Sequence, residues 1–107
     1  MAALRLENKA TEMLRELFAG RPVLRAVVWD RIEAIADDWR ANSEPAVPPY
    51  APSRRMSNLT PIADDGQVWG VCIILRVDFD PETVYILAVN AAPALWPDDE
   101  SSADSEW

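Results

Sequence analysis

The sequence from residue 67 to residue 89 reads Gln67-Val68-Trp69-Gly70-Val71-Cys72-Ile73-Ile74-Leu75-Arg76-Val77-Asp78, then Phe79-Asp80-Pro81-Glu82, then Thr83-Val84-Tyr85-Ile86-Leu87-Ala88-Val89. Two runs rich in β-branched and aromatic residues flank a short polar connector, a pattern that predicts two antiparallel strands joined by a tight loop. Pro81 has no N–H to donate, so it belongs in the turn. Both runs are nearly continuous in apolar residues, which predicts central strands covered by helices on at least one face.

Two amphipathic helices are predicted upstream of this hairpin. Apolar residues recur at three- and four-residue spacing from Lys9 to Ala19, and Gly20 is a suitable helix stop. A second helix is expected to begin near Pro22 and to end near Asn42. Residues 2–7 alternate loosely, so they fit either a short edge strand or the first turn of a helix. The apolar stripes of the two helices need a surface to pack against, and the hairpin is the only large apolar surface that the sequence predicts.

The remaining segments are less regular. Residues 42–61 contain five prolines and are expected to form an extended crossover, with a short strand within Met56–Ile62 as an option. The Asp64-Asp65-Gly66 sequence suits a hairpin turn. Residues 90–97 are expected to wrap around the domain, and the acidic residues 98–107 to form a disordered tail.

These elements predict an α+β fold in which an N-terminal α-hairpin packs on a small antiparallel β-sheet. Residues 1–97 form the single predicted domain, and residues 98–107 the tail. A chain of 107 residues with 50% hydrophobic residues is long enough to bury a core of its own.

The charge of the chain is unevenly distributed. Ten Lys and Arg residues against 18 Asp and Glu residues give a net charge of −8, and five of those acids lie in the tail. An acidic body opposes nonspecific binding of nucleic acid, which needs a basic face, but it is compatible with a local basic patch. RNA is therefore a disfavoured partner, and a protein partner is expected. The chain has no histidine and one cysteine, Cys72, which is read as a buried, unreactive thiol. We expect no metal or cofactor, no membrane association and a cytoplasmic location.

Five residues are candidate binding residues: Tyr50, Arg54, Arg55, Arg76 and Trp96. Arg54 and Arg55 are the densest basic point, suited to phosphates or an acidic partner, although a solvated surface pair is the alternative. Arg76 interrupts an apolar strand, so it either opens toward a groove or pairs with a carboxylate at the sheet rim. Trp96 stands among acids and suits an interface. No catalytic residue can be assigned.

The acidic pairs are given structural interpretations. Asp37-Asp38 is read as a solvated helix face and Asp64-Asp65 as a turn. A metal or acid–base site would need several carboxylates to converge.

The order of short strand, helix, helix, basic loop and hairpin resembles the RelE/ParE superfamily of small toxins from bacterial toxin–antitoxin pairs. The resemblance covers roughly residues 3–90. It rests on the sequence Arg31-Ile32-Glu33-Ala34-Ile35-Ala36-Asp37-Asp38 in the second helix and on Leu75-Arg76-Val77-Asp78 before the last turn. It implies a protein that binds a macromolecular target and is neutralised by a partner peptide.

The chain departs from the family pattern where ribonuclease members carry their basic and aromatic residues. The usual strand arginine aligns with Cys72, and neighbouring aromatic positions align with Val71 and Leu75. The resemblance therefore implies a gyrase-directed member or one without ribonuclease activity. The alternative is a non-enzymatic acidic inhibitor, of phage or host, that occupies a basic site on a partner protein.

Overall fold

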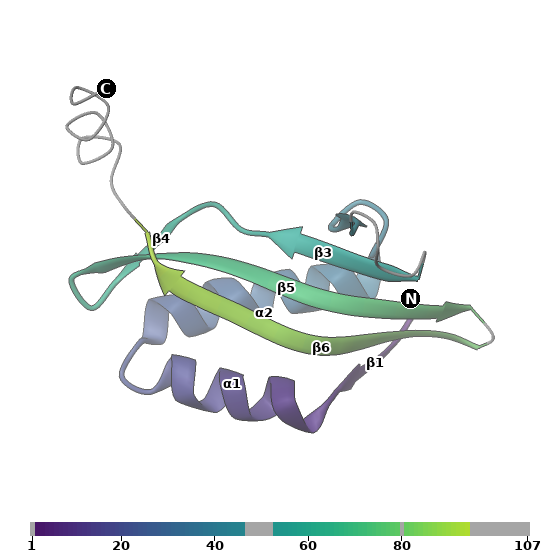
Figure 1. Ribbon diagram of the computed structural model, residues 1–107, viewed down its shortest axis with the longest axis horizontal. Coiled ribbons are helices and arrows are strands. Elements are labelled where there is room, and N and C mark those ends of the chain that lie inside the picture. Colours follow the sequence, from purple (N-terminus) through teal and green to yellow (C-terminus); the bar gives the residue numbers. More distant parts are fainter. Residues whose placement is uncertain (1, 47–52, 80, 95–107) are drawn as a thin grey trace.

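The computed structural model describes residues 2–46, 53–79 and 81–94, which form two helices and a mixed six-stranded sheet (Figure 1). In chain order the elements are β1 (Ala3–Leu6), α1 (Asn8–Phe18), α2 (Pro22–Asp37), β2 (Glu44–Pro45), β3 (Arg54–Asn58), β4 (Ile62–Asp64), β5 (Gln67–Phe79) and β6 (Glu82–Pro93). The strands lie in the order β1-β6-β5-β3-β2, and β4 pairs with β5. The predicted α+β class is confirmed.

The long hairpin predicted from residues 67–89 is formed by β5 and β6, with Pro81 in the turn between them. Their pairing runs from Trp69 opposite Pro93 to Phe79 opposite Glu82. The expectation that residues 90–97 wrap around the domain was wrong for residues 90–93, because these residues continue the ladder with β5. A register shift between Ile74 and Leu75 leaves Leu87 as an extra, bulged residue of β6.

The prediction of a purely antiparallel sheet was wrong. β1 is a strand, as one of the two interpretations of residues 2–7 required, and it pairs in parallel with β6, from Ala3 opposite Thr83 to Leu6 opposite Ile86. A parallel pair needs a long crossover, which the chain between β1 and β6 supplies. Alternation of apolar residues identifies a strand but does not identify its neighbour.

The first helix ends as predicted, since Gly20 follows it with a φ of 70°, the left-handed conformation that glycine adopts readily. The second helix ends at Asp37, five residues before the expected end at Asn42. The Asp38 carboxylate accepts the N–H of Ala41 at 3.2 Å, which turns the chain. The Asn42 amide then donates to the carbonyl oxygens of Ala34 and Asp38, at 3.0 and 2.9 Å. The carbonyl of Ala34, one of the last four in the helix, therefore has a partner outside the helix.

Besides the two-residue strand β2, which pairs with β3, the segment before the hairpin contains two short strands in place of the one optional strand within Met56–Ile62. The first, β3, starts at Arg54 because it pairs with residues 72–76 of β5. The second, β4, is joined to β5 by the two-residue loop Asp65-Gly66. Both loop residues have positive φ, 52° and 70°, which defines a type I′ turn and confirms the predicted bend.

The helices cover one face of the sheet. Alternate β5 residues, Val71, Ile73, Leu75 and Val77, are buried against α1 and α2, together with Leu24, Val28, Ile32 and Ile35 of α2. In Figure 1, α2 lies behind the sheet and α1 runs along β6. The intervening β5 residues Cys72, Ile74 and Arg76 are only half-buried and lie on the opposite face. We call this opposite side, which neither helix covers, the open face.

Candidate functional site

Four strands place one basic or aromatic residue each at the same level of the open face. The sheet register sets Arg5 of β1 opposite Tyr85 of β6, Tyr85 opposite Arg76 of β5, and Arg76 opposite Arg54 of β3. Neighbouring strands lie about 4.8 Å apart, so these four residues span roughly 14 Å across the sheet. We call them the arginine–tyrosine row.

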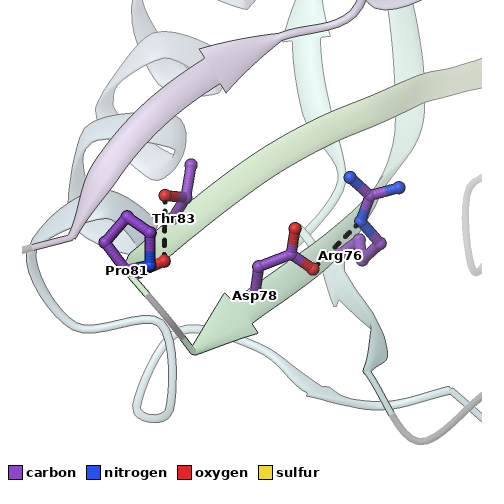
Figure 2. A network of polar contacts seen from close by, with 4 residues as sticks. All are labelled: Arg76, Asp78, Pro81 and Thr83. Carbon is purple, nitrogen blue, oxygen red and sulfur yellow. Dashed lines mark hydrogen bonds and ion pairs between the residues drawn. The ribbon is translucent and has the colours of Figure 1, made fainter.

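The centre of the row is organised by Arg76. Its guanidinium carbon lies 4.3 Å from the centroid of the Tyr85 ring. Its Nε lies 3.3 Å from Oδ1 of Asp78, the ion pair drawn in Figure 2. The rim pairing predicted for Arg76 is therefore confirmed with Asp78. This ion pair is worth about 0–1 kcal/mol, because both side chains are more than a third exposed. Its main effect is to hold Arg76 over the tyrosine ring.

The row carries three guanidinium groups, and the Asp78 carboxylate forms an ion pair with that of Arg76. Arg5 is exposed, and Arg54, Arg76 and Tyr85 are half-buried. Guanidinium groups bind phosphate or carboxylate oxygens in a bidentate way, and an aromatic ring offers a stacking surface. The row is therefore suited to an anionic or aromatic group of a large ligand.

The next two levels of the open face carry one charged residue, Glu44. The first of these levels consists of Glu44, Met56, Ile74 and Ala88, and the second of Asn58, Cys72 and Asn90. Cys72 is half-buried at the second of these levels, so the expectation of a buried thiol was wrong. Burial, and secondarily the charge of Glu44, raise the pKa of the Cys72 thiol above its ordinary value.

Arg55 points away from the row. Its register partner is the buried Leu75, and it donates from Nε to the hydroxyl of Ser43 and from Nη2 to the carbonyl of Ser43, both at 2.8 Å. Its guanidinium also lies 4.9 Å from the Trp39 ring. Burial, followed by the nearby Arg40, lowers the pKa of Arg55, and Glu44 opposes this shift. Arg55 therefore fastens the chain after α2 to β3.

The structure thus separates the predicted candidates. Arg54 and Arg76 meet on the open face, whereas Arg55 lies on the helix side. Tyr50 and Trp96 lie outside the described residues. Neither Tyr85 nor Arg5 was among the five predicted binding residues. The alternation of Leu4 and Leu6 does assign Arg5 to the face opposite the core, but its place beside Tyr85 depends on the parallel pairing.

The described residues contain no cluster of three or more His, Cys, Asp or Glu side chains that could hold a metal ion. Neither α1 nor α2, the two described helices, is long and apolar enough to cross a membrane.

Comparison with known proteins found no matching family model, no matching curated protein and no matching solved structure.

Proposed function

We propose that this chain is a RelE/ParE-like toxin-family protein that binds a macromolecular target through the arginine–tyrosine row. The observation that carries the proposal is the convergence of Arg5, Tyr85, Arg76 and Arg54 on a face that neither helix covers. The order β1, α1, α2 and terminal hairpin supports it, since this is the order on which the family resemblance rests.

Cleavage of RNA is not part of the proposal. The position that the resemblance aligns with the family's strand arginine is Cys72, two levels of the sheet away from the row. The chain also has no histidine that could transfer a proton near neutral pH. The row supplies charge and stacking, which are means of binding a target.

The test is expression of the full chain alone from an inducible promoter. Growth should stop on induction, and a double Arg54→Ala and Arg76→Ala variant expressed to the same level should restore it. Lys9→Ala is the matched control, because Lys9 is exposed on α1 and lies outside the row. Normal growth with the unmodified chain, or arrest that the double variant does not relieve, would contradict the proposal.

The second candidate function is a non-enzymatic inhibitor that occupies a basic site on another protein. It is favoured by the acidic outer surface of α2, where Asp30, Glu33 and Asp37 are all exposed and share one side of the helix. An inhibitor of this kind should be harmless when expressed alone. It should bind its basic partner with an affinity that falls steeply as salt is added.

A further inference from the structure

Two buried nitrogen donors lie side by side at the end of the domain where α1 gives way to α2. They are Nε of Arg21 and Nε1 of Trp69, and neither has a hydrogen-bond partner among the described residues. The Arg21 guanidinium carbon lies 4.7 Å from the Trp69 ring centroid. Buried donors are nearly always paired in folded proteins, so two adjacent exceptions call for an explanation.

These two residues line a hollow of about 250 Å³ between the helices and the sheet. Its other walls come from Met13, Glu16 and Leu17 of α1 and from Val89 and Ala91 of β6. The walls are mainly apolar, and the volume is below the range typical of cofactor and drug sites. The hollow has the size for one or two side chains of a peptide.

The charge of the hollow favours a carboxylate. Among the described residues, no carboxylate forms an ion pair with Arg21, and the one hydrogen bond of its side chain runs from Nη1 to the Leu17 carbonyl at 3.0 Å. That bond fixes one edge of the guanidinium against α1. The remaining nitrogens and the indole N–H are donors, so they match a group with several acceptor oxygens.

We propose that the hollow binds an acidic peptide segment of a partner protein, with an apolar side chain against Leu17 and Val89 and a neighbouring carboxylate on Arg21 and Trp69. A small rotation of Arg21 off the indole ring lets the carboxylate reach both donors. This inference is independent of the toxin proposal, because the hollow and the arginine–tyrosine row share no residue.

The test uses the full chain labelled with ¹⁵N and the probe peptide acetyl-Ser-Leu-Ser-Asp-Asp-Glu-amide, a sequence that does not occur in this chain, with the Asn-Asn-Gln version as the uncharged control. The indole resonance of Trp69 is identified by its absence from a Trp69→Phe variant. We expect the acidic peptide to shift this resonance downfield and the uncharged peptide to leave it in place.

Three variants define the contacts. Arg21→Met should weaken binding about tenfold or more, because it removes the charged donor. Arg15→Met, an exposed arginine of α1 that does not line this hollow, should leave the affinity unchanged. Glu16→Gln should tighten binding, because it removes a competing carboxylate from the rim. Thermal melts of each variant separate loss of binding from loss of folding.

Two results would overturn the proposal. One is an unchanged affinity in Arg21→Met together with an unmoved Trp69 resonance. The other is binding that occurs only after Asp98, Asp99 and Glu100 are replaced by their amides. The second result would mean that acidic residues of the same chain use the site, so that no partner is needed.

Discussion

The start of α2 depends on a carboxylate from a distant strand. Arg21, at the N-cap position, makes no capping hydrogen bond with its side chain, and the first turn of the helix contains no acid. Oδ2 of Asp64, at the end of β4, accepts the backbone N–H of Leu24 at 2.8 Å. Asp64 therefore performs the function of an N-cap from 40 residues away.

Replacing Asp64 should destabilise the domain by a predictable amount. Loss of an N-cap acceptor costs about 1 kcal/mol, and loss of a negative charge near a helix N-terminus costs about 0.3–1 kcal/mol. Asp64→Ala loses both and should lower the free energy of unfolding by about 1–2 kcal/mol. Asp64→Asn keeps an acceptor oxygen and should lose only the charge contribution. For a domain of this size, the Ala variant should melt roughly 5–10 °C lower.

The measurement is urea and thermal denaturation of the full chain followed by circular dichroism. The matched control is Asp65→Asn, because Asp65 is the exposed neighbour and Asn tolerates its φ of 52°. This control should stay within about 0.5 kcal/mol of the unmodified chain. If Asp64→Ala were as stable as the control, the capping argument would be refuted.

Three further predictions concern the side chains of Ser57 and Cys72 and the backbone of Gly66. Ser57→Ala should lower the free energy of unfolding, measured by urea denaturation, by about 1–3 kcal/mol, because the buried Ser57 hydroxyl donates to the Asn42 carbonyl at 2.7 Å. A loss below about 0.5 kcal/mol would contradict this prediction. At pH 8, iodoacetamide should alkylate Cys72 more slowly than it alkylates a cysteine in an unstructured peptide, because the raised pKa of Cys72 leaves less thiolate. Glu44→Gln should speed the reaction, because it removes a charge that raises this pKa. Mass spectrometry measures both rates. Gly66→Ala should lower the free energy of unfolding, measured by thermal denaturation, by about 1–2 kcal/mol, because Gly66 has a φ of 70° and an added Cβ would meet nothing within 4 Å, so that backbone strain is the cost. Gly66→Asn should lower it less, and equal losses in the two variants would contradict the strain argument.

The sequence predicted the parts of the fold that depend on local periodicity. The β5–β6 hairpin, the two helices and the Asp65-Gly66 turn all have short-range signals, and all three are present. The end of α2 was placed too late because Trp39 extends the apolar spacing of the helix. Trp39 is buried, but it follows the helix end and its Nε1 donates to Glu82 at 3.3 Å.

The candidate site was less predictable, because it depends on register. Arg54 and Arg55 are adjacent in sequence and were treated as one basic point, but consecutive residues of a strand face opposite sides. Arg5 and Tyr85 are 80 residues apart and become neighbours only through the parallel pairing of β1 with β6. No property of the sequence near Arg5 indicates that partner.

The pairing of β1 with β6 also sets the order in which the protein can be completed during synthesis. The ribosome makes β1 and both helices first, but the strands that bury their apolar faces end at residues 79 and 93. Until Ile86 has emerged, Leu6 has no ladder partner and α1 lacks β6, the strand on which it packs. The nascent chain therefore exposes apolar surface for most of its translation, so slowing synthesis should increase its dependence on chaperones.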